Sequence, residues 1–70
     1  MSIGARIKGF RKQQGLTQVK LAKNAGISRS YLADVEANRY NPSLSTLMNV
    51  AQVLGIVVSC LEVLKLIGIR

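Results

Sequence analysis

Residues 18–37 read Gln-Val-Lys-Leu-Ala-Lys-Asn-Ala-Gly-Ile-Ser-Arg-Ser-Tyr-Leu-Ala-Asp-Val-Glu-Ala, a pattern that predicts two short helices joined by a tight turn. Gly26 falls in the turn, where glycine takes the left-handed conformation without a Cβ clash. Ala22 falls where the two helix axes would cross, and a small side chain there lets the backbones approach closely. The apolar residues spaced to pack the second helix onto the first are Ile27, Leu32 and Val35. This spacing is typical of a helix-turn-helix, whose second helix enters the DNA major groove.

The composition agrees with a polyanion-binding protein and argues against an enzyme. The 70 residues fit one small domain with ten Lys/Arg and three Asp/Glu, a formal net charge of +7 that favours nucleic acid or an acidic membrane surface. The chain has no histidine, which removes the usual general base and the commonest metal ligand. The lone Cys60 is expected to be a small buried hydrophobe. We therefore expect no enzymatic activity, no metal, no cofactor and no small-molecule substrate.

Helix boundary residues extend the prediction to five helices and no sheet. Hydroxyl residues suited to N-cap positions precede four apolar-periodic segments; they are Ser2, Thr17, Ser28 and Ser43. Residues suited to the left-handed closing position follow; they are Gly15, Asn38 and Gly55. Ser59 and Glu62 form a capping box for a fifth helix.

Helical periodicity predicts which side chains face the core. In the first helix they are Ile3, Ile7 and Phe10, and in the second Val19, Leu21, Ala22 and Ala25. In the third helix they are Leu32 and Val35, and in the fourth Leu44, Leu47, Met48, Ala51 and Leu54.

Three groups of residues, which together span nearly the whole chain, carry a family resemblance. They are Ile3-Gly4-x-Arg6-Ile7-Lys8 with Arg11-Lys12-x-x-Gly15-x-Thr17-Gln18; Leu21-Ala22-x-x-Ala25-Gly26-x-Ser28 with Ser30-Tyr31-Leu32-x-x-Val35-Glu36; and Asn41-Pro42-Ser43-x-x-x-Leu47 with Val50-Ala51-x-Val53-Leu54. The chain resembles the Cro/CI-type (Xre) helix-turn-helix family, and is similar to SinR-type regulators and restriction-modification controller proteins. The resemblance implies an all-α, compact five-helix, lambda-repressor-like DNA-binding domain over residues 1–70, with its helix-turn-helix motif at 18–37.

Residues at helix starts and in the loop after the motif are the expected phosphate contacts. In such domains Thr17 and Gln18 hold a phosphate at the N-terminus of the second helix, where free N–H groups and the helix dipole favour an anion. The alternative for Thr17 is capping alone, and Tyr31 is more often a packing residue. Lys20 and Lys23 remain open between DNA contact and simple solubility. The full set of expected phosphate contacts is Thr17, Gln18, Ser28, Tyr31, Arg39, Tyr40, Asn41 and Ser43.

The expected base contacts follow from the outward face of the third helix. They are Arg29, Ser30, Ala33 and Asp34. Arg29 can grip guanine O6 and N7 with two hydrogen bonds, and its alternative is a phosphate contact. Asp34 is unusual beside phosphates; it either accepts from a cytosine amino group or orients Arg29 or another basic side chain. The resemblance also implies a structural ion pair between Arg11 and Glu36.

The apolar C-terminal stretch, about residues 56–69, is the candidate dimerisation segment. Its expected interface residues are Val57, Val58, Leu61, Leu64 and Ile67. The alternatives are that the segment packs inside the domain, or that the chain is a fragment whose missing domain covers it. The apolar run from Val53 to Ile69 is too short for a bilayer; Gly55 breaks it, and Glu62 and Lys65 interrupt it. No signal peptide is visible.

These features predict a sequence-specific DNA-binding transcription regulator, a cytoplasmic, nucleoid-associated protein of a bacterium or phage. We expect a homodimeric repressor that binds double-stranded DNA through the major groove at an inverted-repeat operator, with no membrane partner. The alternatives are an antitoxin-like protein-interaction module whose apolar C-terminal segment docks a partner, and a polyanion binder driven by charge alone.

Overall fold

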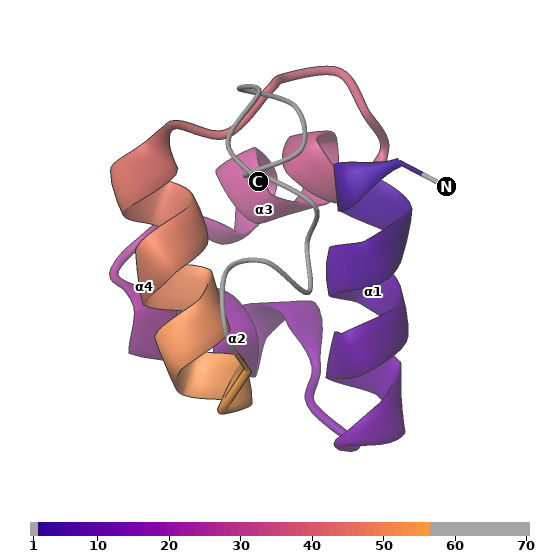
Figure 1. Ribbon diagram of the computed structural model, residues 1–70, viewed down its shortest axis with the longest axis vertical. Coiled ribbons are helices and arrows are strands. Elements are labelled where there is room, and N and C mark those ends of the chain that lie inside the picture. Colours follow the sequence, from indigo (N-terminus) through magenta and orange to yellow (C-terminus); the bar gives the residue numbers. More distant parts are fainter. Residues whose placement is uncertain (1, 57–70) are drawn as a thin grey trace, which may run out of the picture.

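The computed structural model describes residues 2–56, which form four α-helices and no strand. They are α1 (Ile3–Gln13), α2 (Gln18–Ala25), α3 (Arg29–Glu36) and α4 (Leu44–Leu54). In Figure 1, α1 and α4 flank the molecule on the right and left, and α2 and α3 lie behind them. The all-α prediction is confirmed. The expected fifth helix, with its capping residues Ser59 and Glu62, lies outside the described residues.

The four predicted N-caps are all confirmed by the structure. Each hydroxyl oxygen accepts a hydrogen bond from the backbone N–H three residues ahead, over 3.0–3.2 Å. The helix ends are confirmed as well, because the backbone has positive φ at each predicted closing residue: Gly15, Gly26, Asn38 and Gly55. Local sequence signals therefore set the boundaries of these helices.

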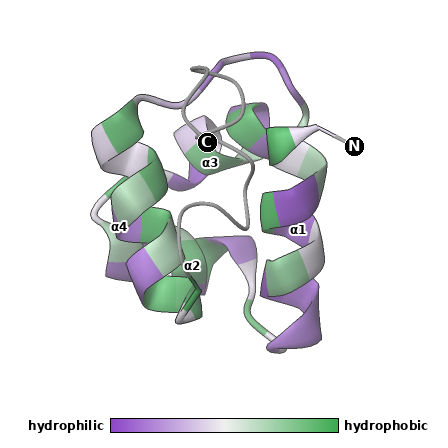
Figure 2. Cartoon of the chain, in the orientation of Figure 1, coloured by the Kyte–Doolittle hydropathy of each residue, from purple (hydrophilic) through white to green (hydrophobic). Residues whose placement is uncertain are grey.

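The core lies where the four helices meet. Five side chains are almost completely buried: Ile7, Leu21, Leu32, Val35 and Val50. Half-buried Ile3 and Phe10 pack against this cluster, as does Ile27. Figure 2 shows hydrophobic residues on all four helices and a largely hydrophilic loop between α3 and α4.

Three predicted core residues are wrong, because their side chains are more than half exposed. They are Val19 at 57%, and Leu44 and Met48 at 54% each. The buried side of α4 is formed by Leu47, Val50, Ala51 and Leu54. Met48 follows Leu47 by about 100° around the helix, which carries it off this side. The core-facing side predicted for α4 was therefore rotated away from the observed one: it included Leu44 and Met48 and omitted Val50.

Two close contacts fix α1 against its neighbours. The buried Gly4 lies against the last turn of α3, where an added Cβ would come within 2.9 Å of the Glu36 carbonyl oxygen and closer still to that of Val35. At the other end, the Gln14 side-chain amide donates to the Leu54 carbonyl at the end of α4. No helix within residues 2–56 is both long and apolar enough to cross a membrane.

Candidate nucleic-acid interface

The outward side of α3 carries the residues expected to contact bases. Arg29 and Ser30, the first two residues of the helix, are exposed. Ala33 and Asp34, one turn further on, are half-buried. Leu32 is fully buried and fixes the rotation of the helix against the core. The structure thus places this set on the side of α3 that faces away from the core.

The expected phosphate contacts lie at the starts of α2, α3 and α4 and in the loop before α4. Six of the eight are exposed: Thr17, Ser28, Arg39, Tyr40, Asn41 and Ser43. The Thr17 hydroxyl accepts from the Lys20 N–H, so it caps α2. The two half-buried members, Gln18 and Tyr31, both have side-chain partners within the protein.

A buried ion pair joins α1 to the end of α3. Arg11 Nε donates to Glu36 Oε2 over 2.8 Å, and Arg11 Nη2 donates to Oε1 over 3.0 Å. Arg11 is 8% exposed and Glu36 7%. The remaining Arg11 donor, Nη1, reaches the Leu16 carbonyl over 2.9 Å. This two-point bond fixes the direction of the Glu36 carboxylate as well as neutralising it.

Gln18 joins the same cluster. Its Nε2 donates to Glu36 Oε1 over 3.1 Å, which ties the first residue of α2 to the last residue of α3. The Gln18 side chain is therefore engaged by Glu36, while its backbone N–H stands at the start of α2. Sequence reasoning missed this bond, because its 18-residue separation along the chain follows no local rule.

Asp34 pairs with Arg39 on the outer surface. Arg39 Nη1 donates to Asp34 Oδ1 over 3.2 Å, and the Arg39 backbone N–H donates to the Asp34 carbonyl over 2.8 Å. Of the two roles left open for Asp34, the geometry matches the orientation of a basic side chain. The partner is Arg39 rather than Arg29.

A ring stack lies next to this pair and was also missed from the sequence. The rings of Tyr31 and Tyr40 have centroids 6.3 Å apart and planes inclined by 26°. Tyr31 is half-buried on α3, and Tyr40 lies in the loop with 57% exposure. The loop residues 39 and 40 are thus both attached to α3.

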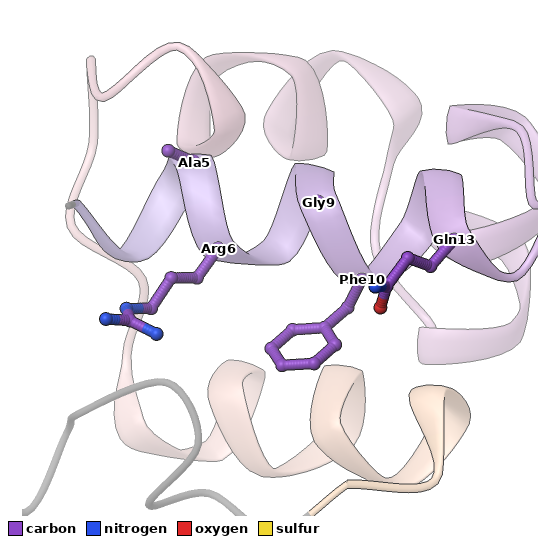
Figure 3. Close-up of a pocket in the computed structure, with 5 residues that line it drawn as sticks. All are labelled: Ala5, Arg6, Gly9, Phe10 and Gln13. Atoms are coloured by element: carbon purple, nitrogen blue, oxygen red, sulfur yellow. The ribbon is translucent and has the colours of Figure 1, made fainter.

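A shallow hollow of about 370 Å³ lies along α1, and sequence reasoning did not find it. In Figure 3 the side chain of Phe10 points from α1 toward α4, and the side chain of Arg6 extends away from α1 on the same side. The residues that line the hollow all belong to α1: Ala5, Arg6, Gly9, Phe10 and Gln13. None of them belongs to the outward set of α3. The five expected dimer-interface residues, Val57, Val58, Leu61, Leu64 and Ile67, lie outside the described residues.

The fold and the exposed face of α3 define a small helix-turn-helix domain. The chain belongs to the helix-turn-helix family HTH_3, which matches residues 7–57. It is 62% identical over 61 residues to the immunity repressor protein of Bacillus phage phi105, covering 87% of this chain and 42% of that protein. It is 43% identical over 60 residues to the transcriptional regulator SinR of Bacillus subtilis, covering 84% of this chain and 54% of SinR.

Solved structures agree with this assignment. A crystal structure of SinR in complex with DNA superposes with a TM-score of 0.82 at 43% identity, covering 86% of this chain and 97% of that chain. The restriction-modification controller protein C.AhdI from Aeromonas hydrophila gives 0.82 at 36% identity, covering 84% and 89%. The resemblance to SinR-type regulators and controller proteins is therefore confirmed. The chain spans about half the length, or less, of the phage repressor and of SinR.

Proposed function

We propose that the chain is a sequence-specific transcriptional repressor that places α3 in the major groove of double-stranded DNA. The observation that carries this proposal is the position of Arg29 and Ser30, exposed at the start of a helix whose opposite side is locked into the core by Leu32 and Val35. A guanidinium at this point reaches base edges, where arginine pairs with guanine through two hydrogen bonds. The net charge of +7 supplies the sequence-independent attraction to the duplex.

Phosphate contacts would set the register of α3 on the duplex. The first N–H groups of α2 and α4 have no partner within their own helix and follow the exposed Thr17 and Ser43, which suits these helix starts to phosphate oxygens. Arg39 adds an exposed cation in the loop before α4. These groups come from three separate segments of the chain. Their arrangement supports a duplex lying across this face.

We further propose that the protein acts as a homodimer on an inverted repeat. One domain of this size reads few base pairs, and two-fold dimers reading half-sites one helical turn apart are the usual solution. The proposed interface is the apolar segment at about residues 56–69, which lies outside the described residues from Val57 onward. Repression rests on the 62% identity to a phage immunity repressor, which is named for that activity.

The test is selection from a random duplex library at ~150 mM salt, close to physiological ionic strength. The expected result is an enriched inverted repeat with half-sites about 10 base pairs apart. Arg29→Ala should relax one position in each half-site and cost about 1–3 kcal/mol in discrimination there. Lys8→Ala is the matched control, because it removes an exposed cation from α1 without touching α3.

Two results would contradict the proposal. Retention of duplexes without any consensus would leave only electrostatic binding. A selected sequence that is unchanged in Arg29→Ala would remove α3 from base readout. In either case the antitoxin-like alternative would become the hypothesis to test, through substitution of Leu64 or Ile67.

A further inference from the structure

The loop that follows α3 folds back onto the outward side of that helix. Arg39 is attached to Asp34 twice, through its backbone N–H over 2.8 Å and through Nη1 over 3.2 Å. The next residue, Tyr40, stacks on Tyr31 of the same helix. Asn38 has a φ of 64°, and this left-handed turn reverses the chain after α3, so that the next two residues return to the helix. Arg39 thus starts from a fixed backbone position beside α3.

The charges explain why this attachment matters for a DNA-binding surface. Within residues 2–56 the acidic side chains are Asp34 and Glu36, and Glu36 is buried against Arg11. Asp34 is therefore the carboxylate on the outward side of α3, with 29% of its side chain exposed. Alone, it would repel phosphates. Its bond to Arg39 offsets that charge and holds the Arg39 guanidinium beside it.

The exposure of the pair shows what it can and cannot do. The Arg39 side chain is 74% exposed, and ion pairs this open to water contribute little to folding stability. The bond does restrict where the guanidinium lies. Arginine carries five N–H donors, and the bond to Asp34 engages only Nη1. The other donors of the fork remain suited to a phosphate oxygen.

We propose that Asp34 is a positioning residue that presets Arg39 for a phosphate of the bound duplex, rather than a reader of bases. This inference rests on the proposed function, since DNA is the ligand. A long exposed arginine loses rotamer freedom when it binds, and a bond that restricts it beforehand reduces that loss. Asp34 therefore increases the affinity for DNA although its own charge opposes that of the phosphates.

The experiment is a double-mutant cycle of Asp34→Asn and Arg39→Ala, measured on the selected operator and on an unrelated duplex. Asp34→Asn should weaken binding by about twofold to tenfold per bound protomer, the range expected for immobilising one such side chain. The loss should appear on both duplexes, because phosphates carry no sequence information. In the Arg39→Ala background the same substitution should cause no further loss.

Three further readouts separate positioning from base reading and from a merely structural role. The logarithm of the DNA affinity falls linearly with the logarithm of the salt concentration. Arg39→Ala should make this slope shallower by about 0.9 per bound protomer, the value for one phosphate contact. Asp34→Asn should leave the base preferences of the selected operator unchanged. Both variants should melt close to the parent temperature, because the pair is exposed. Lys8→Ala again controls for the loss of one exposed cation.

Three outcomes would overturn the inference. Stronger binding of Asp34→Asn to every duplex would show that the carboxylate only repels DNA. A changed preference at one base pair would show that Asp34 reads a base. An equal loss with and without Arg39 would show that the two residues act independently. If the parent protein binds no DNA, both the proposed function and this inference are wrong. If Arg29→Ala relaxes the operator sequence as expected, the proposed function holds and the double-mutant cycle tests the inference alone.

Discussion

Two glycines on one helix give a matched test of how α1 packs. An added Cβ at Gly4 would lie 2.7 Å from Asn38 Oδ1 and 2.9 Å from the Glu36 carbonyl oxygen, and closer still to the Val35 carbonyl. Real Cβ contacts essentially never fall below 3.0 Å, so something must move. Two of these three atoms are backbone in the last turn of α3 and cannot rotate away. At Gly9 an added Cβ meets no described atom within 4 Å.

The magnitudes follow from these contacts. Overpacking a well-packed site costs about 1–3 kcal/mol. Replacing a helical glycine by alanine gains about 0.8–1.0 kcal/mol in a helix interior, and Gly4 gains less because it is the second residue of α1. Gly4→Ala should therefore destabilise the fold by about 1–2 kcal/mol. Gly9→Ala should stabilise it by about 0.5–1 kcal/mol.

Thermal unfolding followed by circular dichroism measures both changes. For a domain of this size 1 kcal/mol corresponds to about 4–8 °C in Tm. Gly4→Ala should lower Tm by about 5–15 °C, and Gly9→Ala should raise it by about 2–8 °C. A Gly4→Ala protein as stable as the parent would refute the close approach of α1 to α3. A less stable Gly9→Ala protein would show that this side of α1 is covered.

Substitutions at three other residues test the contacts around α3. Glu36→Gln leaves the buried Arg11 guanidinium without its counter-charge and should cost about 3–5 kcal/mol in urea unfolding; a loss below about 1 kcal/mol would contradict a buried pair. Tyr31→Phe should preserve the ring stack on Tyr40 and the affinity for DNA, whereas Tyr31→Ala should remove the stack and weaken DNA binding. Weaker DNA binding by Tyr31→Phe would instead indicate that the Tyr31 hydroxyl contacts a phosphate. Ser28→Ala removes the N-cap of α3 and should lower the free energy of unfolding of the protein by about 1 kcal/mol. An unchanged free energy of unfolding would show that water replaces the Ser28 hydroxyl and that the cap adds no stability.

The helix boundaries were predictable because each depends on a few consecutive residues. A hydroxyl at the N-cap and a residue that tolerates positive φ at the end act within one turn. The rotation of each helix was harder to predict. Leu44 and Met48 are apolar like Leu47, so composition along α4 did not identify its buried side. That side is chosen by the helices that pack against it.

The outward side of α3 was predictable for the same reason as the boundaries, since Leu32 and Val35 alone fix which side faces the core. The contacts of its polar residues were not. Asp34 and Arg39 are separated by five residues, and their contact requires the chain reversal at Asn38. Helical pair rules apply to residues three or four apart on a continuous helix. They do not extend across such a reversal.

The two groups of contacts around α3 should respond differently to salt. Glu36 receives hydrogen bonds from α1 and from the start of α2, and its pair with Arg11 is buried, so mobile ions screen it weakly. The Asp34–Arg39 pair is open to water and is screened like any surface pair. Rising salt should therefore leave the packing of α1, α2 and α3 unchanged while it weakens the bond between Arg39 and Asp34. It should weaken the proposed phosphate contacts in the same range, so affinity falls while the face presented by α3 stays the same. In the proposed complex the face presented by α3 therefore stays fixed, while the strength of the phosphate contacts varies with ionic strength.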